Sequence, residues 1–168
     1  LGIVPKYAIV DNGAILLIDG KVDKEWLAET EKLIEIKLPS IVENDLFTQI
    51  RHVDDFFIFL KSDNPTEALI YLESFICKQN FMICAIRNKV YVIPKKLNKG
   101  LAIDRLCKRL GKTFVISSGD SKLDISMLEK ANIAICPHSL ELKNKNQIIL
   151  KEELFSIHML KNVNKLIE

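Results

Sequence analysis

Several features are scarce in this chain of 168 residues, and each absence excludes a class of protein. No apolar run approaches the roughly 18 residues needed to cross a bilayer, and no secretory signal pattern occurs. Lysine and arginine number 24 against 22 acidic residues, and the net charge of +2 gives no support to nucleic-acid binding. We therefore expect a cytoplasmic protein whose partners include neither a membrane nor a nucleic acid.

Cysteines and glycine-rich loops are also few. The four cysteines form no CxxC pair and have no histidine at zinc spacing, which predicts reduced thiols rather than disulfides or a zinc site. No GxGxxG or GxxxxGK[ST] loop occurs, which argues against a nucleotide-binding α/β domain. Apolar residues make up 48% of the chain and charged residues 27%, so a globular fold with a real core is expected.

The part of the chain before Pro94 predicts a strand pair followed by a mixed segment. Apolar runs bounded by turn residues predict strands at Tyr7–Val10 and Ala14–Ile18, and Asp19-Gly20 follows as a hairpin-type turn. The next elements are predicted as helix, helix, strand, helix and hairpin, at Lys24–Leu38, Ser40–Val53, Asp55–Leu60, Thr66–Lys78, and Phe81–Ile86 with Lys89–Ile93. That order suits an antiparallel α+β unit.

Strands and helices alternate through short loops in the rest of the chain. The predicted elements are a helix, a strand, a helix, two strands and a helix, at Leu101–Leu110 (with Gly111 as its C-cap), Thr113–Ile116, Ser121–Lys130, Ile133–Ile135, Ile148–Leu150 and Glu152–Ile167. Such alternation is typical of a parallel sheet. The fold class is therefore α/β: a Rossmann-like parallel core formed by 1–18 and 96–168, interrupted by an inserted α+β domain at 19–95.

Two aspartates follow the predicted strand Thr113–Ile116, and their spacing admits two interpretations. Carboxylates at the carboxyl end of such a strand suit a hard cation such as Mg²⁺, and Gly119 lets the backbone approach a ligand. Alternatively, Ser121 caps a helix with Asp124 at the capping-box position. The two are compatible, since Asp124 can cap the helix while Asp120 points into a site.

Lys99 is a second candidate, because it stands just before Gly100 where a helix is predicted to open. The helix dipole disfavours a lysine there by roughly a few tenths of a kcal/mol. Helix N-terminal N–H groups together with an ammonium can bind a phosphate. The alternative is a solvated surface lysine, and the tripeptide "NKG" by itself favours that alternative.

Taken together, these segments resemble a known family. "NKGLAIDRLCKRLG" followed by "GDSKLDISMLEKANIAICP" resembles the third and fourth motifs of the haloacid dehalogenase-like hydrolases. The resemblance is to the large-cap branch with the Cof-type and sucrose-phosphatase-like phosphatases, and "YAIVDNGAILL" looks like the strand that leads into the cap there. It covers the two expected core portions well and the cap only in outline.

The resemblance implies a Mg²⁺-dependent phosphomonoester hydrolase that acts on a small phosphorylated metabolite such as a sugar phosphate. In that family an aspartate attacks the phosphomonoester, with Mg²⁺ neutralising charge. By resemblance, Asp120 would bind the metal, Asp124 would hold its water shell or the loop, and Lys99 would bridge the nucleophile and the phosphoryl oxygens. Further candidates, for substrate or phosphate binding, are Asn12, Gly13 and Ser121.

The chain also departs from the family pattern. Leu123 stands before Asp124 where most relatives have asparagine, and neither the Asp-x-Asp nucleophile motif nor the Ser/Thr motif occurs. In the family both precede the "NGA" strand, so we expect that this chain is part of a longer enzyme and is inactive alone. The upstream segment or another chain is then expected to complete the sheet. The alternatives are a noncatalytic binding or regulatory relative, and a phosphomutase.

Overall fold

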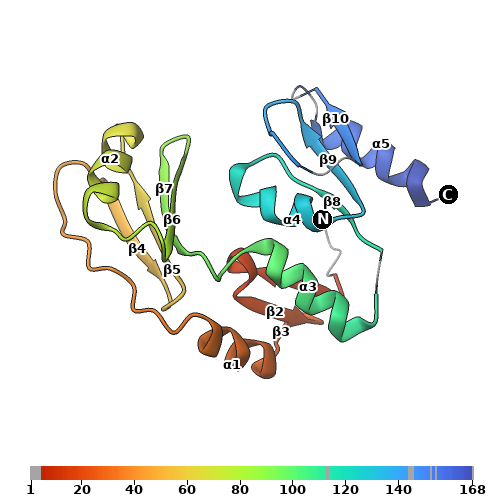
Figure 1. Cartoon of the computed structure of the whole chain (residues 1–168), viewed down its shortest axis with the longest axis horizontal. Coiled ribbons are helices and arrows are strands. Elements are labelled where there is room, and N and C mark those ends of the chain that lie inside the picture. Colours follow the sequence, from red (N-terminus) through yellow and green to blue (C-terminus); the bar gives the residue numbers. More distant parts are fainter. Residues whose placement is uncertain (1–4, 113, 144–145, 152, 154, 168) are drawn as a thin grey trace. The chain divides into compact units, whose positions relative to one another are not determined.

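The computed structural model describes residues 5–112, 114–143, 146–151, 153 and 155–167, and Figure 1 traces them from red to blue. Its contacts divide the chain into a unit that ends at Leu97 and a unit that begins at Asn98. Within the described residues, no helix has both the length and the apolar character required to cross a membrane. The division falls near the predicted junction at 95/96, and the insertion of 19–95 between two core portions stays a prediction.

The first unit opens with a three-stranded antiparallel sheet. Its strands, in the spatial order β1-β2-β3, are Tyr7–Val10, Ile15–Ile18 and Lys21–Val22. A tight turn, Asp11–Gly13, joins the first two, and all three of its residues have positive φ. Helix α1, Lys24–Leu33, follows, and its N-cap Asp23 accepts a hydrogen bond from the backbone N–H of Trp26.

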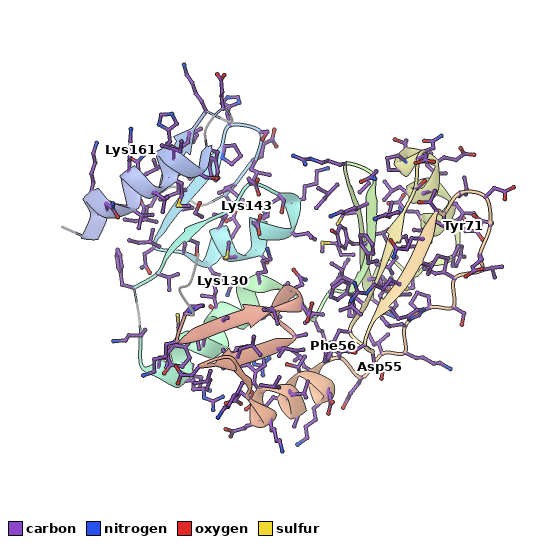
Figure 2. The ribbon with its side chains drawn as sticks, turned by 180° about the vertical axis from the view of Figure 1, so that it is seen from behind. Asp55, Phe56, Tyr71, Lys130, Lys143 and Lys161 are labelled. Atoms are coloured by element: carbon purple, nitrogen blue, oxygen red, sulfur yellow. The ribbon has the colours of Figure 1, made fainter. Side chains whose placement is uncertain are left out.

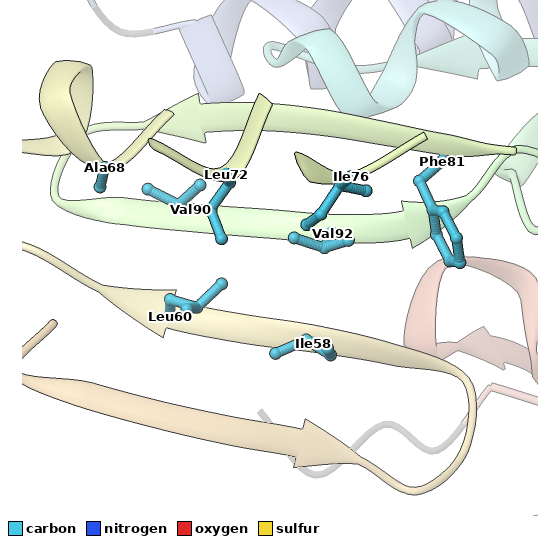
Figure 3. Packing of buried hydrophobic residues seen from close by; sticks show 8 residues of the cluster. All are labelled: Ile58, Leu60, Ala68, Leu72, Ile76, Phe81, Val90 and Val92. Atoms are coloured by element: carbon cyan, nitrogen blue, oxygen red, sulfur yellow. The ribbon is translucent and has the colours of Figure 1, made fainter. Parts of the chain in front are cut away.

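A four-stranded antiparallel sheet makes up the rest of the first unit. Its strands, β4 to β7, are Gln49–Val53, Phe57–Lys61, Phe81–Ile86 and Lys89–Pro94, in the spatial order β4-β5-β7-β6. Helix α2, Pro65–Phe75, packs on one face of this sheet, as Figure 3 shows. The buried cluster between them consists of Ile58, Leu60, Ala68, Leu72, Ile76, Phe81, Val90 and Val92. The predicted hairpin of the last two strands is confirmed.

The helix predicted over Ser40–Val53 is wrong. Its second half forms strand β4, and its first half has no helix, with the Asn44 side chain accepting a hydrogen bond from the backbone N–H of Leu46 in a local turn. Helix α1 likewise ends at Leu33 rather than Leu38. Apolar residues of these two segments lie outside helices and pack against the buried cluster between α2 and the sheet, which we call the α2 cluster: Ile36, Leu38, Ile41 and Phe47. Tertiary packing therefore overrides the local helical pattern.

The second unit is an α/β layer around a parallel sheet. Helix α3 spans Lys99–Leu110, α4 spans Ile125–Lys130, and α5 spans Phe155–Ile167. The strands β8, β9 and β10 are Ile116–Ser118, Ile133–Pro137 and Gln147–Leu150, in the spatial order β10-β9-β8. Both pairings are parallel, as predicted. Gly111 ends α3 in the left-handed conformation, which confirms it as the C-cap.

Helices α3 and α4 also contact each other at the surface. The Nζ of Lys130, labelled in Figure 2, lies 2.8 Å from Oδ2 of Asp104. Both side chains are about half exposed, so this ion pair contributes little to stability. All four cysteines are free, as expected from their spacing.

The strand predicted at Thr113–Ile116 is displaced. Strand β8 begins at Ile116 and includes Ser117 and Ser118, which pair with Ala134 and Ile135 of β9. Thr113 lies outside the described residues, and the backbone N–H of Val115 donates to the side chain of Asn132 instead of to a strand. Within the described part of the chain, β8 has a strand neighbour on one side only, and so does β1.

Candidate functional site

Lys99 is the first residue of helix α3, and the structure directs its ammonium to Asp124. Asn98 caps the helix by accepting a hydrogen bond from the backbone N–H of Leu101, so the chain turns into the helix just before the lysine. The Nζ of Lys99 lies 2.5 Å from Oδ1 of Asp124. The Lys99 side chain is 37% exposed, so the ammonium can also reach a ligand from solvent.

Asp124 is the most densely bonded side chain of this region. Its Oδ2 accepts hydrogen bonds from the Ser121 hydroxyl at 2.7 Å, from the Ser121 backbone N–H at 3.0 Å and from the Asp120 N–H at 3.2 Å. The predicted capping box of Ser121 and Asp124 is present at the start of the helical turn Lys122–Asp124. Asp124 therefore fixes the shape of the loop that follows β8.

The same contacts set the charge of Asp124. Burial of its side chain, which is 8% exposed, disfavours the carboxylate and tends to raise its pKa. Hydrogen bonds from Lys99 and Ser121, together with the positive charge of Lys99, favour the carboxylate, and the pKa of Asp124 is lowered. Asp124 is therefore an anion at neutral pH.

Two glycines allow these elements to come together. A Cβ on Gly119 would overlap the side chain of Asp124. The absence of a side chain at Gly119 therefore lets the backbone approach the Asp124 carboxylate rather than a ligand. A Cβ on Gly100 would overlap the backbone carbonyl of Ser126 in α4, and the Gly100 N–H donates to Ser126 Oγ at 3.1 Å. Sequence reasoning missed Ser126, because the contact joins residues 26 positions apart.

Asp120 joins this network only through its backbone N–H, which donates to Asp124. Its side chain is exposed, and it lies two residues beyond the carboxyl end of β8, next to Gly119. Among the described residues, no group of three or more His, Cys, Asp or Glu side chains could hold a metal ion. Asp120 can supply one hard oxygen ligand, and Mg²⁺ commonly takes only one or two carboxylates together with water and substrate phosphates. The donor chemistry thus fits Mg²⁺ in part, since Asp120 offers one exposed carboxylate while Asp124 is held by Lys99 and Ser121.

Asn12 and Gly13 belong to the first unit, where they hold the turn between β1 and β2. The Nδ2 of Asn12 donates to the carbonyl of Leu97 at 2.9 Å, while its Oδ1 is buried without a hydrogen-bond partner among the described residues. The carbonyl of Gly13 accepts from Nε1 of the buried Trp26 at 3.1 Å. These contacts give both residues a structural role, and phosphate binding by either stays a prediction.

A family model described as haloacid dehalogenase-like hydrolase matches residues 6–152, most of the chain. A comparison with curated proteins finds no match.

Several solved structures share the fold. A haloacid dehalogenase-like hydrolase from B. subtilis matches with 21% identity and a TM-score of 0.51, over 69% of this chain and 43% of its own. The sucrose-phosphatase from Synechocystis sp. PCC6803 matches with 14% identity and a TM-score of 0.64, over 95% of this chain and 75% of its own. A putative HAD/COF-like hydrolase from Plasmodium vivax matches with 18% identity and a TM-score of 0.53, over 67% of this chain and 43% of its own. The chain thus spans less than half the length of two of these three relatives.

Proposed function

The chain belongs to the haloacid dehalogenase-like hydrolases, and on that premise we propose that it carries part of the active site of a Mg²⁺-dependent phosphatase. The substrate class that we propose is a small phosphorylated metabolite, such as a sugar phosphate. The observation that carries the proposal is that Lys99, at the start of α3, is bonded to Asp124, which also binds the N–H of Asp120 in the loop after β8. A protein described as a sucrose-phosphatase shares the fold over 95% of this chain, which agrees with the proposal.

Each residue of the group has a distinct task in this proposal. Lys99 places one positive charge beside the reaction and stabilises negative charge that develops on the phosphoryl oxygens. Asp124 holds the ammonium of Lys99 and the loop in place through its four hydrogen bonds. Asp120 would hold Mg²⁺ as an oxygen ligand. When bound, the metal would supply further charge neutralisation to the phosphoryl group.

No Asp-x-Asp motif occurs in these 168 residues, so the proposal takes the nucleophile from outside them. We therefore propose that the chain alone hydrolyses no phosphomonoester. Among the described strands β8 is paired on one side only, and its other side is a place where a further strand can pair, supplied by another segment or another chain. A noncatalytic relative is the alternative, and the finding that favours it is the same absence of a nucleophile.

Substitution of Lys99 tests the proposal directly. In the longest natural form of the protein, Lys99→Ala should lower kcat for p-nitrophenyl phosphate by about 100-fold or more while changing KM little, because the charge acts mainly in the transition state. Lys78→Ala, which removes an exposed lysine from the turn after α2, is the matched control. A change confined to KM, or no change, would contradict the role of Lys99.

A further inference from the structure

The four-stranded sheet of the first unit has a second face, opposite α2, with an unusual composition. Side chains alternate between the two faces along a strand, so Phe59 and Lys61 of β5 point away from the α2 cluster. Tyr91 and Lys89 of β7 are their register partners, and Arg51 of β4 is the partner of Phe59 on the other side. We call these five residues the aromatic–basic face. All five are at least partly exposed.

The three cations of this face have no acidic partner among the described residues. Lys78, Lys99 and Lys130, by contrast, each form an ion pair with a carboxylate. Lys61 and Lys89 stand directly opposite each other in the register, and like charges in that position destabilise a sheet. Their strands are the two central strands of the sheet, so the lysines do not protect an exposed edge from pairing. The opposition of these two charges therefore costs stability.

The aromatic pair lies beside these cations. The rings of Phe59 and Tyr91 have centroids 5.6 Å apart with an interplanar angle of 55°. The Nζ of Lys89 lies 5.9 Å from the centroid of the Phe59 ring. Because neighbouring positions on a sheet face are about 5–8 Å apart, one small ligand can contact both rings and all three cations. Aromatic rings on a sheet surface offer a base a stacking platform.

We propose that the aromatic–basic face binds a nucleotide, with its base against Phe59 and Tyr91 and its phosphates against Arg51, Lys61 and Lys89. Two or three cations match the charge of a nucleoside diphosphate. Two rings can stack only one or two bases, and the net charge of the chain is +2, so a mononucleotide fits better than a nucleic acid. This ligand site is independent of the proposed phosphatase activity, because it uses none of the residues assigned to that activity.

Isothermal titration with ADP as the probe tests this site. We expect the double variant Lys61→Gln/Lys89→Gln to weaken ADP binding by about tenfold or more, since charge-assisted contacts to the phosphates are lost. Tyr91→Leu should weaken ADP binding but leave the weaker binding of pyrophosphate unchanged. Lys78→Gln, which removes one exposed positive charge elsewhere in the same unit, should bind ADP like the wild-type chain.

A thermal melt without ligand separates loss of the site from loss of the fold. Lys61→Gln alone and Lys89→Gln alone should each have a melting temperature at or above that of the wild type, because one of two opposed like charges is removed. Absence of ADP binding, or binding that all variants share, would overturn the proposal. Pyrophosphate that binds as tightly as ADP would overturn the role of the rings. A single-stranded oligonucleotide that binds more tightly than ADP would overturn the assignment to a mononucleotide.

Discussion

The Nζ of Lys99 and the Oδ1 of Asp124 lie 2.5 Å apart, which joins the first turn of helix α3 to the loop after strand β8. The lysine's positive charge at a helix N-terminus is locally unfavourable, and the carboxylate compensates for it. The pair therefore serves the fold as well as the proposed chemistry. Because both partners lie in the second unit, the pair can be tested in the chain as it stands.

A double-mutant cycle measures this pair. We expect Lys99→Met to lower the free energy of unfolding by about 1 kcal/mol, since the lysine is more than a third exposed and solvent screens its charge. Asp124→Asn should cost more, about 1–3 kcal/mol, because it also disturbs the loop hydrogen bonds. Urea unfolding of both single variants and the double variant gives the coupling energy. Additive effects would show that the two residues do not interact in solution.

The stability that Asp124 provides should depend on pH in a defined direction. Its pKa is lowered in the folded chain, so the unfolded state binds a proton first as the pH falls. The contribution is therefore complete above the ordinary aspartate value of about 3.9 and is lost as the pH falls through the lower folded value. In urea unfolding with EDTA, wild type and Asp124→Asn should differ more at pH 6 than at pH 3. A difference that grows toward low pH would contradict the direction of the shift.

Gly100→Ala should destabilise the second unit although alanine favours helices. The added Cβ would overlap the backbone carbonyl of Ser126, and backbone cannot move aside as a side chain can. We expect overpacking to cost about 1–3 kcal/mol, which outweighs a gain of up to about 1 kcal/mol in helix propensity and leaves a net loss. Leu101→Ala, at the exposed neighbouring position, is the control and should cost less than about 1 kcal/mol. An unchanged melting temperature for Gly100→Ala would show that α3 and α4 are not packed this closely.

The success of the sequence predictions followed from how local each signal was. The parallel α/β unit and the C-terminal end of α3 were predictable because strand runs and the Gly111 cap act within a few residues. The hairpin of β6 and β7 was predictable for the same reason. The helix expected at Ser40–Val53 failed because β4 forms only through its pairing with β5, which no local pattern encodes.

The candidate site shows the same limit. The aspartates after β8 and the capping box of Ser121 and Asp124 were predictable from spacing. The hydrogen bond from Lys99 to Asp124 joins residues 25 positions apart. Position 100 needs a glycine because a Cβ there would overlap the backbone carbonyl of Ser126 in α4. Such contacts depend on how α3 packs against α4, so the sequence alone offered the residues but not their geometry.

The most direct test of the proposed function is the activity of Asp120→Asn in the longest natural form of the protein. Asp120 is exposed and outside the ion pair, so this variant should melt like the wild type. Its Mg²⁺-dependent hydrolysis of p-nitrophenyl phosphate should fall below about a tenth of the wild-type rate, because an amide is a poor substitute for a hard anionic ligand. Asp63→Asn, at an exposed position after β5, is the matched control and should retain full activity. Activity that survives Asp120→Asn, or a wild-type protein that hydrolyses nothing, would contradict the account.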